Sequence, residues 1–255
     1  MSKLPKQHQF IDVSDYGRFV ARWIATNLKK TSFTPIHVTT LFIISGILAI
    51  YCILYNYYLS AAFFLILKSI LDAADGELAR LKNTPSYIGR YYDSIADIIL
   101  NFLFILTFWY ITDCSIVNMI LAFVGIQLQG TLYNYYYVIL RNKVNGDSTS
   151  RVFEYTTPTA FKGESQHYVN IFHKIFNLLY YVFDKFIYLL DTKAMNSQPF
   201  PKWFMTLLSA LGLGSQLLIM AVMLVLQLEE FVIPFFIGYS LLIVIFVSIR
   251  RLYLK

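Results

Sequence analysis

Hydrophobic positions along the chain fall into six long blocks that are separated by short polar connections. The blocks are Ile36–Tyr57, Leu59–Leu81, Ile88–Ile111, Ile116–Leu140, Trp203–Leu226 and Phe231–Ser248. A helix of roughly 20 predominantly apolar residues is long enough to cross a bilayer. The pattern therefore predicts an all-α, polytopic integral membrane protein with six transmembrane helices.

Two further segments are amphipathic. In Tyr16–Leu28, apolar residues recur at helical spacing while basic residues lie largely off that face. This predicts a helix in the membrane interface, and a basic helix that binds a partner protein is the alternative. Tyr168–Leu190 has a longer apolar stripe, interrupted by charged residues. It could be a seventh span, but that would move the basic C-terminus outside, so a second interfacial helix is favoured.

Composition and charge placement support this interpretation. The chain of 255 residues is 57% hydrophobic and 14% charged, whereas a soluble domain has about 25% charged residues. If the N-terminus is cytosolic, the outer loops near Asn56–Ser60, Thr112–Ser115 and Gln227–Glu230 contain no Lys or Arg, and every basic residue except Lys68 falls on the cytosolic side. The positive-inside rule then predicts that both termini are cytosolic.

The chain therefore divides into an N-terminal cytosolic segment, residues 1–34, and a six-span domain, residues 35–255. A cytosolic loop of about residues 142–201 within the domain contains the second amphipathic helix. In a prokaryote this would be a protein of the cell membrane. No nucleic-acid partner is expected.

Four aspartates lie inside the second and third predicted spans: Asp72, Asp75, Asp93 and Asp97. Each costs roughly 2.5–3.5 kcal/mol at the centre of a membrane helix, so such residues are functional by default. At 3.6 residues per turn Asp75 shares the face of Asp72, and Asp93 and Asp97 form one stripe. Because a short turn makes the two helices antiparallel neighbours, we expect these faces to converge about two turns below the cytosolic surface.

Such a carboxylate cluster suits hard divalent cations, and no nearby His or Cys spacing indicates zinc. Two metal ions could clamp a diphosphate while one acid serves as a general base. Gly76 and Gly89, together with the small Ala79, leave space beside the helices for a base or a phosphate. Arg80 can donate to a phosphate from the rim. Glu77 points away from the acidic face and is interpreted as a rim or packing residue.

The complete spacing resembles the signature of the CDP-alcohol phosphotransferase family. The residues that carry the resemblance are Asp72, Asp75, Gly76, Ala79, Arg80, Gly89, Asp93 and Asp97. The family joins an alcohol to a phosphoryl group carried by a cytidine diphosphate compound and releases CMP. Members are typically homodimers in the membrane.

The resemblance implies a role for each of these residues. Asp72, Asp75 and Asp93 would bind two divalent ions, Mg²⁺ or Mn²⁺, and Asp97 would complete the site and deprotonate the attacking hydroxyl. The small residues of the signature and Arg80 would accommodate the nucleotide and its phosphates. Thr34–Thr39 is similar to the Pro-Asn-x-x-Thr start of the first span in many members, but Ile36 stands where Asn is usual.

Other interpretations of the same residues stay open. The acids could form a cation or proton relay in a transporter, or structural ion pairs with the nearby basic residues. A transporter is also expected to have discontinuous spans or paired repeats, and neither is visible in the sequence. Lys68 is either a site residue or a modulator of Asp72, and Arg141 is a second candidate modulator. Gly76 and Gly89 could serve helix packing.

The substrates can be narrowed only in part. Either a polar alcohol attacks CDP-diacylglycerol, or a lipid hydroxyl attacks CDP-choline or CDP-ethanolamine. The fourth and fifth predicted spans offer Gln127, Gln129 and Asn134, with basic residues only near their cytosolic ends, at Arg141 and Lys202. This favours an uncharged, zwitterionic or lipid acceptor, and CDP-diacylglycerol is the preferred donor. A cluster of tyrosines at residues 133–137 is interpreted as an interfacial belt or as packing residues, with a cation–π wall for a quaternary ammonium as the alternative.

Overall fold

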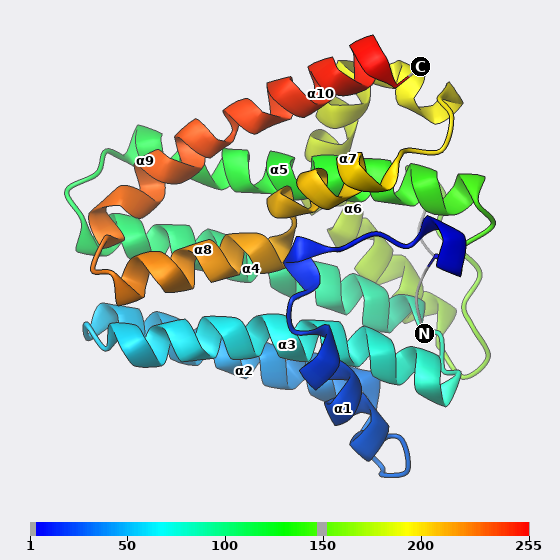
Figure 1. The fold of residues 1–255 in the computed structure, drawn as a ribbon. Coiled ribbons are helices and arrows are strands. Elements are labelled where there is room, and N and C mark those ends of the chain that lie inside the picture. The colour runs from blue at the N-terminus through cyan, green and yellow to red at the C-terminus, as the bar shows by residue number, and fades with distance from the viewer. Residues whose placement is uncertain (1–3, 147–151, 255) are drawn as a thin grey trace.

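Long helices lie side by side in the computed structural model, which describes residues 4–146 and 152–254 (Figure 1). Every regular element in these ranges is helical, as the hydrophobic pattern predicts. The α-helices are α1 (Arg18–Leu28), α2 (Pro35–Leu54), α3 (Tyr58–Lys82), α4 (Tyr87–Ile111), α5 (Ile116–Lys143), α6 (Gln166–Leu190), α7 (Lys202–Leu208), α8 (Leu213–Val225), α9 (Glu229–Tyr239) and α10 (Leu241–Tyr253). Short 3-10 turns are at Lys6–His8, Val13–Asp15, Thr192–Asn196 and Ser209–Leu211.

The start of α2 is fixed by its own side chains. The Thr34 hydroxyl accepts a hydrogen bond from the backbone N–H of His37 at 3.3 Å, and His37 Nδ1 accepts one from the Thr34 N–H at 3.0 Å. Pro35 occupies the first helical position, where its missing N–H costs nothing. The helix is therefore capped although Ile36 has no capping side chain.

A short turn joins α3 to α4 and determines their register. Asn83 ends α3 in the left-handed conformation, with φ of 52°, and the Thr84 N–H donates back to the Ala79 carbonyl at 3.1 Å. Ser86 then caps α4 by accepting a hydrogen bond from the Gly89 N–H at 2.7 Å. The chain therefore turns back after α3, but α3 and α4 do not pack closely along each other, because both pack on α2. The prediction of two adjacent antiparallel helices is correct for the acidic side chains that face each other and not for the packing of the helices.

Within the described ranges, four helical segments are long and apolar enough to cross a membrane, namely α2, α4, α5 and Glu229–Tyr253, which combines α9 and α10. The bent pair α7–α8 raises the number to five. The remaining predicted span, α3, does not qualify because every 18-residue stretch within it contains Lys68, Asp72 and Asp75. Six spans therefore stay a prediction.

The fifth predicted span is not one straight helix. The 3-10 turn Ser209–Leu211 separates α7 from α8, and the two segments meet at an angle of 51°. The N-terminal segment passes close to this break, since a Cβ on Gly214 would lie 1.8 Å from the carbonyl oxygen of Ser14. The prediction of a continuous helix over Trp203–Leu226 was wrong, because apolar content alone does not reveal a close backbone approach.

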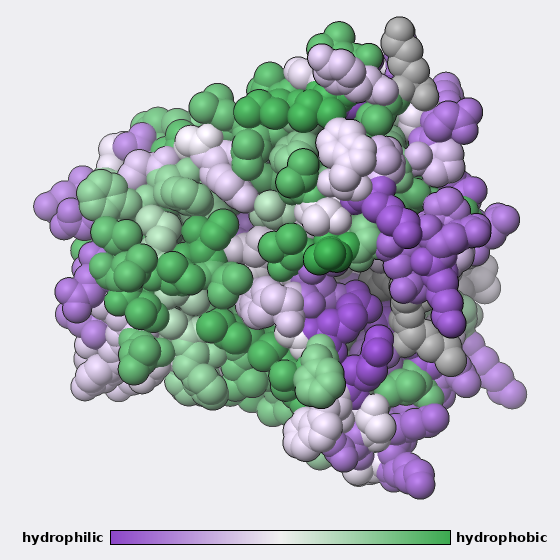
Figure 2. Space-filling model, in the orientation of Figure 1, coloured by the Kyte–Doolittle hydropathy of each residue, from purple (hydrophilic) through white to green (hydrophobic). Residues whose placement is uncertain are grey.

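Both amphipathic segments are helical. α1 buries Ala21 and Ala25 and packs on α3, while Phe19 is 85% exposed. α6 packs on α4 and α5, is not among the candidate spans, and leaves apolar side chains such as Leu178 exposed. Figure 2 shows hydrophobic surface along much of the helical body and hydrophilic residues gathered at the end where the α3–α4 turn lies. An interfacial position of α1 and α6 agrees with these surfaces and stays a prediction.

Candidate active site

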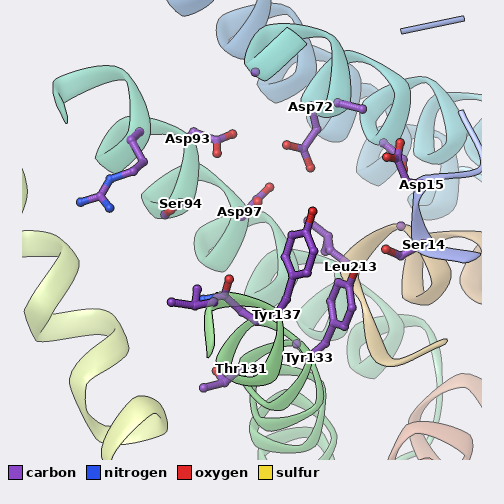
Figure 3. Close-up of a pocket in the computed structure, with 18 of the residues that line it drawn as sticks. Ser14, Asp15, Asp72, Asp93, Ser94, Asp97, Thr131, Tyr133, Tyr137 and Leu213 are labelled. Carbon is purple, nitrogen blue, oxygen red and sulfur yellow. The ribbon is translucent and has the colours of Figure 1, made fainter. Parts of the chain in front are cut away.

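Carboxylates from α3 and α4 meet inside the helical bundle. One oxygen each from Asp72, Asp75 and Asp93 lie within 4.8 Å of one another. Asp97 follows one turn after Asp93, and in Figure 3 the side chains of Asp72, Asp93 and Asp97 point into the same space. The predicted convergence of the two acidic faces is therefore present.

Asp75 is the most enclosed of these acids. Its residue is 7% exposed, and the Thr39 hydroxyl of α2 donates a hydrogen bond of 2.6 Å to its Oδ2. The bond fixes the orientation of the carboxylate, as the partners of metal ligands commonly do. By contrast, Asp93 Oδ1 is buried and has no hydrogen-bond partner among the described residues. A buried, unsatisfied carboxylate oxygen is costly and is suited to coordinating a cation.

Lys68 compensates part of the negative charge. Its side chain is fully buried, and its ammonium lies 3.3 Å from Asp72 Oδ2 and also contacts Asp97 Oδ1 across the helix pair. The sequence predicts that Lys68 is a site residue or a modulator of Asp72, and the contact with Asp97 was not predicted. The structure therefore makes Lys68 a bridge between the two acidic helices.

Arginines line the other side of the acidic cluster. Arg80 donates to Glu77 at 2.8 Å, and Arg22 of α1 lies 3.5 Å from the same carboxylate. Glu77 is 4% exposed and lines the cavity, which agrees with the packing residue of its two sequence interpretations and not with an exposed rim residue. The guanidinium of Arg80 extends over Gly76, where a Cβ would lie 3.4 Å from Arg80 Nη1. A side chain at position 76 would therefore compete with Arg80 for this space.

The acids open into a cavity of about 460 Å³. α3, α4 and α5 form much of its wall, and Tyr133 and Tyr137 rise from α5 opposite the carboxylates (Figure 3). The N-terminal segment closes one side: the Tyr133 hydroxyl donates to Asp12 at 2.5 Å, and the Val13 N–H donates to the Ser209 hydroxyl at 2.8 Å. Residues far apart in the chain therefore share one enclosure.

Residues 152–165, which lead into α6, close another side of the cavity. Glu154 accepts hydrogen bonds of 2.6 Å from Arg90 and from the Tyr91 hydroxyl, both on α4. Burial alone would raise the pKa of Glu154, but the hydrogen bonds and charge of Arg90 outweigh it and lower the pKa below its usual value. Glu164 accepts from the Ser86 hydroxyl at 2.7 Å and from the Ile88 N–H at 3.0 Å. The connection is thus attached to the first turns of α4.

Four residues that the sequence placed at or near the site do not line this cavity among the described residues: Lys68, Ala79, Gly89 and Arg141. A Cβ on Gly89 would lie 3.0 Å from the Ser86 hydroxyl, which indicates a local role in the helix cap. Arg141 is 2% exposed, and its guanidinium lies 5.1 Å from the centre of the Tyr137 ring. Nucleotide contacts by Ala79 and Gly89 stay predictions.

Sequence reasoning missed several residues that line the cavity or support it. Asn101 continues the four-residue stripe of Asp93 and Asp97 and could have been found from that spacing. Thr39 lay in the recognised start of the first span. For Asp12, Glu154 and Tyr180 no local signal exists, since only the tertiary fold brings them to the site. Tyr180 of α6 donates to the Ser94 carbonyl at 2.7 Å, which attaches α6 beside the acids.

Comparison with known families agrees with this geometry. A family model described as CDP-alcohol phosphatidyltransferase matches residues 33–161, which is more than half of the chain and includes all four aspartates. The chain belongs to the CDP-alcohol phosphatidyltransferase family. No curated protein sequence and no solved structure matches the chain.

Membership of the CDP-alcohol phosphatidyltransferase family identifies the kind of protein. It is an enzyme that transfers a phosphate-linked group between a CDP-alcohol and an alcohol, a reaction of phospholipid biosynthesis. Family members typically use a divalent metal, and the group formed by Asp72, Asp75 and Asp93 could hold one. The apolar helices are those of an integral membrane protein.

Proposed function

We propose that this protein moves a substituted phosphate group from a CDP-linked donor to an alcohol acceptor and releases CMP, with four aspartates as the reacting centre. The convergence of Asp72, Asp75 and Asp93, with Asp97 one turn away in the same cavity, is the observation that supports this most directly. The family match covers this pair of helices.

The donor set fits hard divalent ions. It consists of carboxylates, which Mg²⁺ and Mn²⁺ prefer, and the unsatisfied Oδ1 of Asp93 is available to a cation. Asp72, Asp75 and Asp93 would hold two ions, with Asp97 completing the site. Bound there, the ions would supply charge stabilisation for a pyrophosphate and its leaving group.

In the proposed reaction Asp97 accepts the proton of the acceptor hydroxyl. That oxygen forms a bond to the phosphorus that carries the donor's alcohol, the pyrophosphate P–O bond breaks, and CMP leaves with the electron pair. The Lys68 ammonium stabilises the ionised form of Asp97 through their contact. Arg80 would donate to the nucleotide phosphates, and Gly76, Ala79 and Gly89 would leave room for the nucleotide.

CDP-diacylglycerol is the favoured donor, with a small alcohol as acceptor. The alternative is the same chemistry with CDP-choline or CDP-ethanolamine as donor and a lipid hydroxyl as acceptor. In both reactions one substrate reaches the site from the bilayer and the other from water. A cavity between membrane helices and an N-terminal segment allows both routes.

We further propose that six spans, including α3, cross the bilayer, and that both termini and the mouth of the cavity are cytosolic. Residues 1–34 would then precede a transferase domain of residues 35–255, with α1 and α6 in the interface. The distribution of Lys and Arg supports this orientation. A homodimer is expected from the family resemblance.

A substrate panel tests the reaction. The protein in detergent is offered CDP-diacylglycerol with serine, inositol, inositol phosphate or glycerol 3-phosphate, and then CDP-choline or CDP-ethanolamine with diacylglycerol. CMP release that a chelator stops and Mg²⁺ or Mn²⁺ restores is the expected result, whereas chelator-resistant release would reject the metal site. α7 and α8 form a bent pair, so a discontinuous helix of the kind found in transporters is present although the sequence did not indicate one. Ion flux into liposomes without CMP release would favour a transporter instead.

A further inference from the structure

Three buried amides form a layer beneath the acidic cluster. Asn101 of α4, Gln127 of α5 and Gln216 of α8 are 6%, 5% and 1% exposed, and all three line the cavity. At a rise of 1.5 Å per residue, Asn101 and Gln127 lie roughly 20–25 Å from the ends of α4 and α5 that carry Tyr87 and Lys143. The layer is therefore one turn deeper in the bundle than Asp97.

One of these amides, that of Gln216, has a structural role. Gln216 Nε2 donates to the Ile126 carbonyl at 3.0 Å and to Gln129 Oε1 at 3.1 Å. Gln129 in turn donates to the Phe236 carbonyl at 3.2 Å and to the Ser240 hydroxyl at 3.0 Å. This closed network joins α5, α8 and α9 and explains why two glutamines are buried there.

Gln127 is different. Its Nε2 is buried and has no hydrogen-bond partner within residues 4–146 and 152–254. Leaving a buried donor unsatisfied costs about 1–3 kcal/mol, and the position lines a cavity where an apolar side chain would avoid this cost. An amide held in this way is available to an oxygen atom of a bound molecule.

The charges around the cavity limit what that molecule can be. Each arginine that lines it pairs with a carboxylate: Arg18 with Asp15, Arg22 and Arg80 with Glu77, and Arg90 with Glu154. Lys68 is held between Asp72 and Asp97 and is not exposed. A phosphate in the amide layer would have aspartates as its charged neighbours on α4, at Asp93 and Asp97, whereas a hydroxyl or an ester carbonyl matches the amide.

We infer that Gln127, assisted by Asn101, is the specificity-determining site for the acceptor alcohol. It binds a second, uncharged oxygen of an alcohol whose reacting hydroxyl lies at Asp97, and it excludes acceptors that carry a phosphate. The inference rests on the proposed function. The second oxygen can be a neighbouring hydroxyl of a polyol or the ester carbonyl of a diacylglycerol.

The test compares Gln127→Leu with the matched control Gln129→Leu, which removes an amide that does not line the cavity. For Gln127→Leu we expect KM for the acceptor to rise about tenfold, as for the loss of one buried hydrogen bond, with KM for the CDP-linked donor within about twofold of wild type. Gln129→Leu should lower the thermal unfolding temperature and leave the ratio of the two KM values unchanged. The assay is run once with a polyol and once with diacylglycerol as the acceptor, which distinguishes the two sources of the second oxygen. For the acceptor that reacts, an analogue without the second oxygen should have the same KM in Gln127→Leu as in wild type.

The results separate failure of the inference about Gln127 from failure of the proposed function. CMP release from wild type with a preference for glycerol 3-phosphate or inositol phosphate would overturn the inference and leave the proposed function intact. The same follows if Gln127→Leu changes both KM values equally. Absence of CMP release with every acceptor would overturn the proposed function, and the inference with it.

Discussion

The buried ammonium of Lys68 on α3 contacts the carboxylate of Asp97 on α4. The same ammonium lies 3.3 Å from Asp72, so one cation serves acids on two helices. A buried charge is tolerated when it is paired with an opposite charge. Removing one partner destabilises the fold, because the other charge is left buried and uncompensated. The contact therefore links the stability of the helix pair to the carboxylate that the proposed reaction uses as its base.

Lys68→Met should destabilise the protein without bound metal by about 3–5 kcal/mol, the cost of breaking a buried ion pair. Thermal unfolding in detergent measures this, and Mg²⁺ should restore more stability to the variant than to wild type because a divalent ion replaces the lost charge. Exposed Lys30→Met is the matched control. A Lys68→Met protein as stable as wild type would show that the contact contributes little.

Asp97→Asn should lower turnover by about 10²–10⁴-fold, the usual contribution of a general base, while largely sparing metal-dependent nucleotide binding. Asp75→Asn should instead weaken metal and nucleotide binding together, because Asp75 belongs to the carboxylate group. CMP release and Mn²⁺-dependent binding of a cytidine nucleotide measure the two effects. Near-normal turnover in Asp97→Asn would reject its role as the base.

Thr39→Val should lower the affinity for the divalent ion about tenfold, as for the loss of a group that orients a metal ligand. Val keeps the shape of Thr but removes the hydrogen bond to Asp75. The neighbouring Thr40→Val is the control, since among the described residues its hydroxyl donates to the Ile36 carbonyl of its own helix and to no other group. Metal titration of CMP release measures both, and equal midpoints for the two variants would contradict the prediction.

Gly214→Ala should displace the N-terminal segment, because the new Cβ would lie 1.8 Å from the Ser14 carbonyl oxygen. Overpacking of this kind costs about 1–3 kcal/mol, and we expect a lower unfolding temperature together with reduced turnover. Gly238→Ala is the matched control, since its Cβ position has no described atom within 4 Å apart from the adjoining backbone of its own helix. If both variants unfold like wild type, the N-terminal segment does not depend on this contact.

Asp184 of α6 should make stability depend on pH. Burial, followed by the charge of Glu154, raises the pKa of Asp184 to about 7 from an ordinary value of 3.8. The folded protein then holds a proton that the unfolded chain releases, so this contribution is complete at low pH and is lost as the pH rises from about 4 to 7.

Asp184→Asn should remove that dependence and be more stable than wild type at pH 8, by at most about 4 kcal/mol at 1.36 kcal/mol per pKa unit. Unfolding temperatures between pH 5 and 8 measure the effect. Exposed Asp113→Asn is the control for the same chemical change. Parallel pH profiles of wild type and Asp184→Asn would contradict the prediction.

Local periodicity in the sequence predicted several of the helices and the faces on which the aspartates lie. The lengths of the apolar blocks predicted α2, α4 and α5, and the positions of the aspartates predicted which faces of α3 and α4 meet. These features could be predicted because a helix repeats every 3.6 residues, which places residues three or four apart on one face. The aspartate spacing also indicated the family.

Tertiary structure decided what completes the site. Four features depend on how separate helices pack: the contact between Lys68 and Asp97, the hydrogen bond from Thr39 to Asp75, the bend between α7 and α8 beside Ser14, and the amide of Gln127, whose Nε2 has no partner in the described part of the chain. None has a local signature, because burial and hydrogen-bond partners across helices are set by the simultaneous packing of the whole chain. The sequence by itself therefore determined which acids come together, and only the tertiary structure decided which groups compensate, orient and enclose them.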